Sequence, residues 1–225
     1  MAKNGFQISR VNRSRSDAMR AYNRYSRWYD WISGSFERKY AEAGIAQLAV
    51  QPGEHVLEIG YGTGHMLVAL AKQVGPTGKV VGIDISKGMY EITFKRLQES
   101  GIADRVKIVC GDAVTLPFES NTFDVVFMSF TLELFDTPDI PQLLFECQRV
   151  LRKDGRMGVV SLSKKSSEGV ITRIYEKLHS LFPKWIDCRP IYLSYILTEN
   201  GFQIIKESMK SMFGLNIEIV VVINP

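Results

Sequence analysis

The sequence has few cysteines and no long apolar run, and both absences limit what the protein can be. Its three cysteines are scattered singly, with neither the even number of a disulfide framework nor the paired spacing of a metal site. No apolar stretch approaches the roughly 18–20 residues that a membrane-spanning helix needs. The N-terminus also lacks the apolar core of a secretory signal. We therefore expect a reduced, cytoplasmic setting and no bound metal.

A strong charge of one sign is missing over most of the chain, and the N-terminus is the exception. Residues 1–40 hold nine lysines and arginines against three acidic residues, a local balance of +6, whereas the remainder of the chain is slightly acidic. Such a basic segment is typical of contact with nucleic acid or with an anionic membrane surface, or simply of a solvated helix face. These alternatives stay open at the level of sequence.

Apolar strands and amphipathic helices alternate through the middle of the chain. Strands are expected at "HVLEIG", "KVVGIDI", "RVKIVCG", "FDVVFMSF" and "GRMGVVSLS", with helical segments in most of the gaps. This order predicts an α/β fold with a doubly wound, Rossmann-like parallel sheet and helices on both faces. Two further strands, "FQIIKES" and "NIEIVVVI", are expected to pair antiparallel at the end of the chain.

The stretch "VLEIGYGTG" places three glycines directly after the first expected strand. Gly60, Gly62 and Gly64 can adopt positive φ and let the backbone approach a ligand closely. A dinucleotide site expects G-x-G-x-x-G, but the position of its third glycine holds His65. Glu58 would also repel a pyrophosphate. A cationic ligand without a phosphate fits this acid better.

S-adenosylmethionine is such a ligand, because it carries a sulfonium, an ammonium and a ribose diol. Asp84 ends the second expected strand, twenty residues after Gly64, where its carboxylate can accept hydrogen bonds from both ribose hydroxyls. Asp112 and Ala113 follow the third strand, where the adenine edge would lie. Ser129 ends the fourth strand, beside the expected position of methyl transfer.

Four stretches resemble, in order, the motifs of class I S-adenosylmethionine-dependent methyltransferases: "VLEIGYGTG", "VVGIDIS", "GDAVTLPFESNTFDVVF" and "ECQRVLRKDGRMGVVS". The branch that they resemble most contains the C-methyltransferases of ubiquinone and menaquinone biosynthesis. The resemblance implies a seven-stranded sheet, mostly parallel with an antiparallel last strand, and S-adenosylmethionine as the cofactor. It implies cofactor contacts from Tyr29, Glu58, Gly60, Gly62, Thr63, Gly64, Asp84, Ile85, Asp112, Ala113 and Ser129.

Tyr29 and Asp30 resemble a pair in an N-terminal segment that covers the cofactor in small-molecule methyltransferases. The surrounding stretch "AYNRYSRWYDW" has aromatic residues at roughly helical spacing with arginines between them. It either forms a lid that excludes water from the site or packs on the sheet as an ordinary amphipathic helix.

The predicted catalytic residues are Tyr29, Glu133 and His179. Glu133 lies a few residues after the fourth strand, where a helix-start carboxylate is an equal interpretation, and His179 lies in an expected helical insert, where it could instead face solvent. The quinone enzymes usually follow the fourth strand with a Gly-rich stretch that contains Arg or Asn, whereas this chain has "SFTLELFDTPD". The resemblance therefore leaves the acceptor open.

No internal repeat or linker divides the chain, so a single methyltransferase domain is predicted over residues 1–225. Residues 1–50 are expected to form an N-terminal arm with lid helices, and 51–163 the core that binds the cofactor. Residues 164–200 are expected to form a helical insert at the acceptor site, and 201–225 the terminal strand pair.

The leading interpretation is methyl transfer to a small, apolar or lipid-like acceptor, with peripheral contact at the inner face of the membrane. One alternative is a nucleic-acid or protein methyltransferase that docks through its basic N-terminus. The chain lacks both an Asn/Asp-Pro-Pro-aromatic stretch and a Pro-Cys pair, which disfavours methylation of nucleic-acid bases. Another alternative is a module that binds S-adenosylmethionine without catalysis. The oligomeric state is left open.

Overall fold

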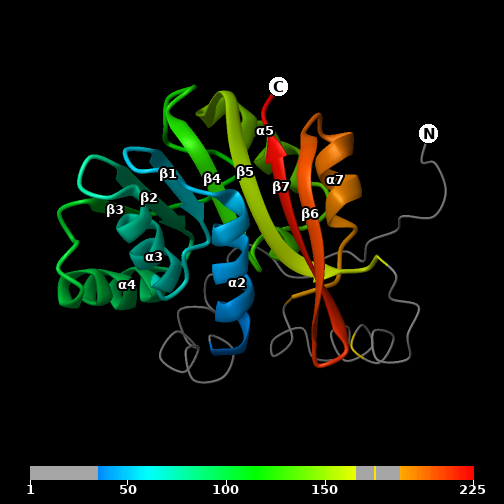
Figure 1. Ribbon diagram of the computed structural model, residues 1–225, viewed down its shortest axis with the longest axis horizontal. Coiled ribbons are helices and arrows are strands. Elements are labelled where there is room, and N and C mark those ends of the chain that lie inside the picture. Colours follow the sequence, from blue (N-terminus) through cyan, green and yellow to red (C-terminus); the bar gives the residue numbers. More distant parts are fainter. Residues whose placement is uncertain (1–34, 166–174, 176–187) are drawn as a thin grey trace.

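A seven-stranded sheet forms the centre of the molecule (Figure 1). The computed structural model describes residues 35–165, 175 and 188–225. The strands, in the order β3-β2-β1-β4-β5-β7-β6, are β1 (His55–Ile59), β2 (Lys79–Asp84), β3 (Val106–Cys110), β4 (Phe123–Ser129), β5 (Leu151–Ser163), β6 (Gln203–Met212) and β7 (Leu215–Ile223). Strands β1 to β5 pair in parallel, and β7 runs antiparallel to both β5 and β6. The predicted sheet with its antiparallel last strand is confirmed.

Helices cover both faces of this sheet, as predicted. One face carries α2 (Ser35–Leu48), α3 (His65–Val74) and α4 (Lys87–Glu99), and the other carries α5 (Ile140–Val150) and α7 (Leu193–Glu199). Along β4, Val125 and Phe127 enter the core beneath the first three helices. Val126 and Met128, which alternate with them, enter the core on the other face. Successive side chains of a strand point to opposite faces, so this one strand supplies both cores.

Two element boundaries differ from those predicted. Strand β5 begins at Leu151, directly after α5 ends at Val150 and four residues before the expected strand "GRMGVVSLS". Asp154 lies inside β5 with φ of 61°, where the register against β4 shifts. Strand β6 continues to Met212, beyond the predicted end at residue 208, and forms a long hairpin with β7.

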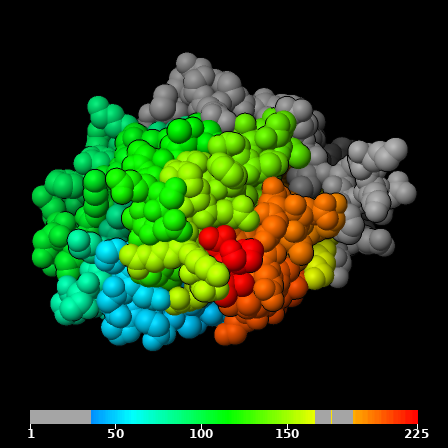
Figure 2. Space-filling view, turned by 90° about the horizontal axis from the view of Figure 1, so that it is seen from above, coloured from blue at the N-terminus to red at the C-terminus, as the bar shows by residue number. Residues whose placement is uncertain are grey.

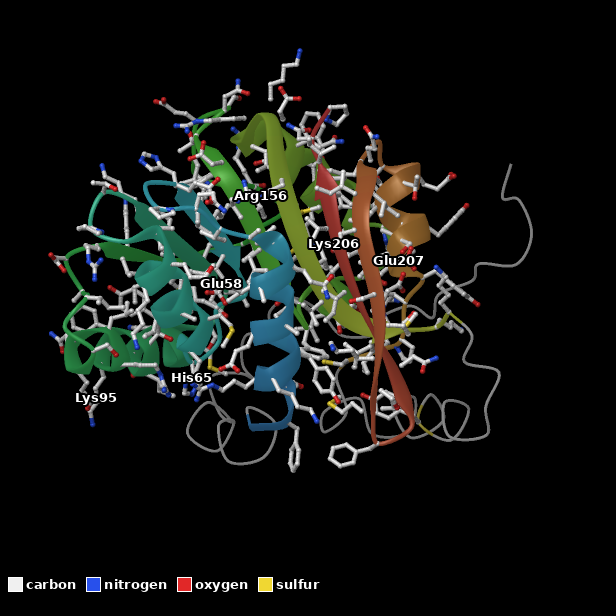
Figure 3. The ribbon with its side chains drawn as sticks, in the orientation of Figure 1. Glu58, His65, Lys95, Arg156, Lys206 and Glu207 are labelled. Carbon is white, nitrogen blue, oxygen red and sulfur yellow. The ribbon has the colours of Figure 1, made fainter. Side chains whose placement is uncertain are left out.

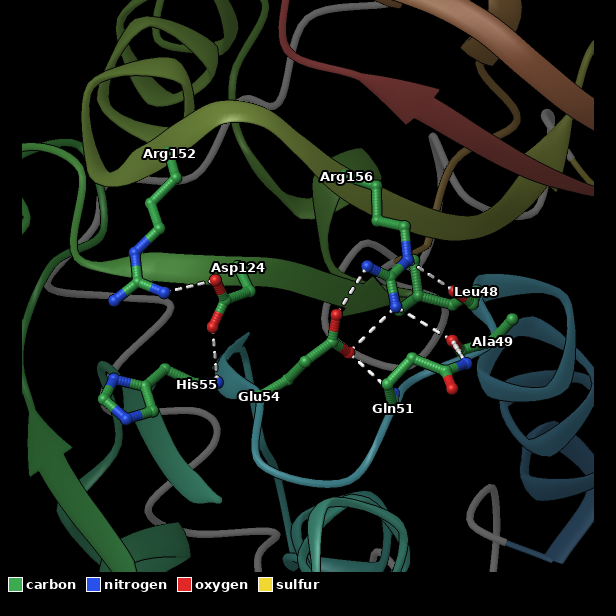
Figure 4. A network of polar contacts seen from close by, with 8 residues as sticks. All are labelled: Leu48, Ala49, Gln51, Glu54, His55, Asp124, Arg152 and Arg156. Atoms are coloured by element: carbon green, nitrogen blue, oxygen red, sulfur yellow. Dashed lines mark hydrogen bonds and ion pairs between the residues drawn. The ribbon is translucent and has the colours of Figure 1, made fainter. Parts of the chain in front are cut away.

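An ion pair joins three elements at the amino ends of the parallel strands (Figure 4). Arg156 of β5 contacts Glu54, just before β1, with 2.7 Å between Nη1 and Oε1. The same guanidinium donates to the carbonyl oxygens of Leu48 and Ala49, where α2 ends. The charges and hydrogen-bonding groups of these residues are paired with one another. They lie at the amino ends of the strands, whereas open α/β sheets bind ligands beside the carboxyl ends. We assign them a structural role.

The view from above shows how this end of the molecule is filled (Figure 2). The C-terminal residues, in red, lie between the yellow-green surface around β5 and the orange surface of α7 and β6.

Of the helices within the described ranges 35–165 and 188–225, none is both long and apolar enough to cross a membrane.

Candidate active site

The order of the strands reverses at β1, which lies between β2 and β4. Ligands of open α/β sheets bind beside the carboxyl ends of strands at such a point. A pocket opens here, bounded by α2, the end of β1, the glycine turn, the start of α3 and the residues that end β4. Five residues of the predicted cofactor set line it, namely Glu58, Gly60, Gly62, Thr63 and Ser129.

The turn between β1 and α3 has a backbone conformation that favours glycine. Gly60, Gly62 and Gly64 have φ of 73°, 51° and 81°, in the left-handed region that other residues rarely adopt. A Cβ atom on Gly60 would lie 2.4 Å from Thr131 Oγ1, whereas one on Gly62 would meet no atom within 4 Å. Packing therefore requires a glycine at position 60. The α-carbon of Gly62 faces open space at the pocket.

Helix α4 holds this turn through two side chains that the sequence analysis did not single out. Thr93 Oγ1 donates to the carbonyl oxygen of Gly62 at 2.8 Å, and Arg96 Nε donates to that of Thr63 at 2.6 Å. Arg96 Nη1 also lies 3.0 Å from His65 Nδ1. His65 thus lines the pocket and contacts the support of the turn. The sequence shows Thr93 and Arg96 only as polar residues within an amphipathic helical pattern, which does not indicate that they contact the turn.

Glu58 is a buried carboxylate with an unsatisfied oxygen. The residue is only 3% exposed, between α2 and α3 (Figure 3), and its Oε2 has no hydrogen-bond partner among the described residues. Burial, and in second place the charge of Asp84, raises the pKa of Glu58 well above its usual range. An unsatisfied buried polar group costs about 1–3 kcal/mol. A cationic ligand in the pocket would supply the missing partner.

Asp84 connects the glycine turn to the neighbouring loops. Its Oδ2 accepts the N–H of Gly62 at 3.0 Å, and its Oδ1 accepts that of Ser86 at 2.9 Å. Burial raises the pKa of Asp84 to about 6, although both backbone hydrogen bonds oppose the shift. A carboxylate can accept about four hydrogen bonds, so this one keeps acceptor capacity for a diol.

The loop after β3 lies beside Asp84, because the N–H of Gly111 donates to the Asp84 carbonyl oxygen at 2.9 Å. Asp112 Oδ1 accepts the N–H of Val114 at 3.1 Å, and Ala113 is buried. Across from this loop, the carbonyl oxygen of Ile85 contacts Cys110 Sγ at 3.6 Å. The predicted adenine-side residues are therefore gathered at the edge of the sheet that carries the glycine turn.

Glu133, a predicted catalytic residue, lies in the short helix η2 (Leu132–Leu134) and is fully buried. Its Oε1 accepts the N–H of Leu162 at 3.1 Å, and its carbonyl oxygen accepts Arg189 Nε at 3.1 Å. These contacts connect η2 to β5 and to the chain before α7. They give Glu133 a structural role, and its catalytic role stays a prediction. Tyr29 and His179 lie outside the described residues.

Helix α2 belongs to residues 1–50, where lid helices were predicted, but none of its residues was among the predicted site residues. Glu37, Arg38 and Ala41 line the pocket, opposite the glycine turn. The guanidinium of Arg38 makes an ion pair with Glu42 one turn further along, at 2.9 Å. The spacing of apolar residues indicates which face of a helix is buried. Tertiary packing decides which edge of the sheet the first turn of that helix reaches.

Comparisons with known proteins show the family of the chain. A family model described as a methyltransferase domain matches residues 56–155, from β1 into β5. A demethylmenaquinone methyltransferase of Geobacillus sp. is 32% identical over 162 residues, which cover 72% of this chain and 68% of that protein. The chain belongs to the S-adenosylmethionine-dependent methyltransferase family. Membership fits the orphaned Glu58 oxygen and the open space beside Gly62, because both leave room for the family's cofactor.

Other relatives in this family match over a smaller part of their length. A demethylmenaquinone methyltransferase of Lactobacillus johnsonii is 32% identical over 161 residues, 72% of this chain and 65% of the relative. One of Symbiobacterium thermophilum is 38% identical over 135 residues, 60% of this chain and 53% of the relative. The chain thus spans between about half and two thirds of these two proteins.

Solved structures share the fold at low sequence identity. A methyltransferase of Aquifex aeolicus superposes with a TM-score of 0.64 and 21% identity, over 82% of this chain and 89% of that one. The cyclase SpnF superposes with a TM-score of 0.77 and 16% identity, over 99% of both chains. A methyltransferase and a cyclase therefore share this fold, so the reaction has to be argued from the site.

Proposed function

We propose that the protein transfers the methyl group of S-adenosylmethionine to a small, apolar ring of the quinone type. The main support for S-adenosylmethionine as the ligand of this pocket is the unsatisfied Oε2 of Glu58, which is buried beside the glycine turn. A pyrophosphate would be repelled there, whereas an ammonium or sulfonium would offset the cost of the buried charge. Asp84, on the other side of the turn, offers acceptors for a ribose diol.

Each group of residues has a task in this proposal. The bound cofactor supplies an electrophilic methyl group. Glu58 and Asp84 orient it through charge and hydrogen bonds, while Asp112 and Ala113 border its adenine. Ser129, which ends β4, and Phe130, which follows it, line the pocket where the reacting atoms would meet. Such a displacement depends mainly on alignment and on exclusion of water, which a buried site provides.

The acceptor part of the proposal is supported by the names of the relatives, which are demethylmenaquinone methyltransferases. Ala41, Met66 and Phe130 give the pocket an apolar component that suits an aromatic ring. A ring carbon that gains a methyl group must lose its proton, so a proton acceptor is needed near the ring. Tyr29, Glu133 and His179 stay the candidates for that step.

A transfer assay tests this function. The full chain is incubated with methyl-labelled S-adenosylmethionine and a reduced demethylated naphthoquinone that carries a short prenyl tail, and the label is partitioned into organic solvent. The reduced ring is used because a hydroquinone carbon is electron-rich and a quinone carbon is not. We expect label in the organic phase, and much less with Asp84→Ala, which removes the diol acceptors.

Total cell extract in place of the defined acceptor widens the same assay. Label confined to RNA or protein would contradict the proposal and favour a macromolecular acceptor. A protein that binds S-adenosylmethionine but labels nothing would instead be a binding module, or an enzyme of another reaction class such as the cyclase that shares its fold. The assay thus separates all three interpretations of the sequence.

A further inference from the structure

The turn of the β6–β7 hairpin carries a phenylalanine in a conformation that phenylalanine disfavours. Phe213 has φ of 52° and is followed by Gly214 with φ of 83°. Because Met212 pairs with Leu215, these two residues form the whole turn. Two-residue turns with positive φ at both positions favour Asn-Gly, and a bulky residue at positive φ is an outlier. Phe213 is nevertheless 74% exposed, so burial in the core does not explain it.

Phe213 forms an exposed aromatic pair with Phe36 of α2. The ring centroids lie 5.1 Å apart with an interplanar angle of 71°, and Phe36 is itself 50% exposed. The hydroxyl of Tyr40 donates to the carbonyl oxygen of Ser211 at 2.6 Å, which fastens α2 to the hairpin just before its turn. The pair is therefore presented by two ordered elements that are joined to each other.

Positive charge accompanies the pair on both elements. Lys39 lies three residues after Phe36 on α2, and its Nζ is 4.8 Å from the centroid of the Tyr40 ring. Lys210 is exposed on β6, three residues before Phe213. Figure 1 shows the hairpin turn and the start of α2 at the same lower end of the molecule. The pocket has part of its wall at this end, because Glu37 and Arg38 of the same helical turn line it.

We propose that Phe36, Lys39, Lys210 and Phe213, here called the hairpin surface, dock the protein on an anionic lipid membrane. Exposed phenylalanines can bury at the boundary between lipid headgroups and acyl chains, and lysines beside them are attracted to anionic headgroups. A turn at the end of a hairpin projects from the molecule, as insertion into a lipid surface requires. The inference rests on the proposed function in one respect, that an apolar acceptor would enter the pocket from the membrane side.

Vesicle sedimentation with the full chain tests this surface. Vesicles of phosphatidylcholine alone are compared with vesicles that also contain phosphatidylglycerol. Wild type is expected to sediment with the anionic vesicles at low salt and to be released by high salt. Phe213→Asn should lower the partition coefficient at least about tenfold, because one exposed phenylalanine no longer inserts. The melting temperature of Phe213→Asn should equal or exceed that of wild type, since asparagine tolerates positive φ.

Phe145→Gln is the matched control, because Phe145 is 57% exposed on α5, on the opposite face of the sheet from α2. It should sediment as wild type does. The hairpin surface loses its assignment if wild type stays in the supernatant, or if Phe213→Asn binds as wild type does. Equal binding to neutral vesicles would overturn the anionic specificity. Sedimentation needs no turnover, so its outcome is independent of the transfer assay.

Discussion

Replacing Glu58 with glutamine is expected to weaken the binding of S-adenosylmethionine about 10–100-fold, the range for a lost hydrogen bond to a charged group. The same variant should melt at a higher temperature than wild type when no ligand is present. Both effects follow from one feature, a buried carboxylate whose Oε2 has no partner among the described residues. The substitution removes a charge that is costly in the empty site and useful in the occupied one. Calorimetry and thermal melts measure the two effects separately.

The stability gain of Glu58→Gln should depend on pH, with a sign that the pKa shifts determine. Burial raises the pKa of Glu58 and brings that of Asp84 to about 6. As pH rises, the unfolded chain therefore releases these protons before the folded chain does, and the free energy of unfolding falls. The gain from Glu58→Gln is expected near pH 7–8 and should vanish below about pH 4, where the carboxyl group is protonated in both states.

Glu146→Gln provides a control with the opposite sign. Glu146 is also a buried glutamate, but its Oε2 lies 2.7 Å from Arg149 Nη2, and this partner lowers its pKa. Its ion pair stabilises the fold above the usual carboxyl pKa and is lost as pH falls, so Glu146→Gln should melt lower at neutral pH. If Glu58→Gln also melted lower, or bound S-adenosylmethionine as wild type does, Glu58 would not be an electrostatic contact of the cofactor.

Alanine at position 60 is expected to destabilise the fold, whereas alanine at position 62 should mainly block the cofactor. A Cβ on Gly60 would lie 2.4 Å from Thr131 Oγ1 at a φ of 73°. We expect Gly60→Ala to cost about 2–4 kcal/mol of unfolding free energy from overpacking and backbone strain. Gly62→Ala meets no atom within 4 Å and should cost only the left-handed conformation, about 1–2 kcal/mol.

The added methyl group of Gly62→Ala would, however, occupy space in the pocket. S-adenosylmethionine binding should therefore be lost in a variant that still unfolds cooperatively, as denaturant titration beside calorimetry would show. Unchanged affinity in Gly62→Ala would mean that the cofactor does not lie against this turn. A Gly60→Ala variant as stable as wild type would show that Thr131 can move aside.

Local signals made it predictable that residues of the glycine turn and of the next strand would meet. A glycine turn, an acid beside it and an acid ending the next strand are fixed by short stretches of chain, and the sheet brings Glu58, Gly62 and Asp84 together as expected. The periods of apolar residues likewise indicated both helical layers. The cofactor contacts of these residues stay a prediction.

Contacts between elements distant in the chain were not predictable in this way. Arg96 reaches Thr63 only because α4 packs beside the turn. The contact between the Glu133 carboxylate and the N–H of Leu162 in β5 likewise depends on tertiary packing. The hairpin surface depends on α2 meeting the β6–β7 turn, and its only local trace is a phenylalanine before a glycine.

Side-by-side calorimetric titration of the full chain with S-adenosylmethionine and with NAD tests the central claim most directly. The two ligands share an adenosine, whose 5′ carbon carries a pyrophosphate in NAD and a sulfonium with a nearby ammonium in S-adenosylmethionine. With Glu58 buried beside the glycine turn, we predict a single site for S-adenosylmethionine and no measurable binding of NAD at the same concentrations. Preferential binding of NAD, or no binding of S-adenosylmethionine, would contradict the assignment of this site.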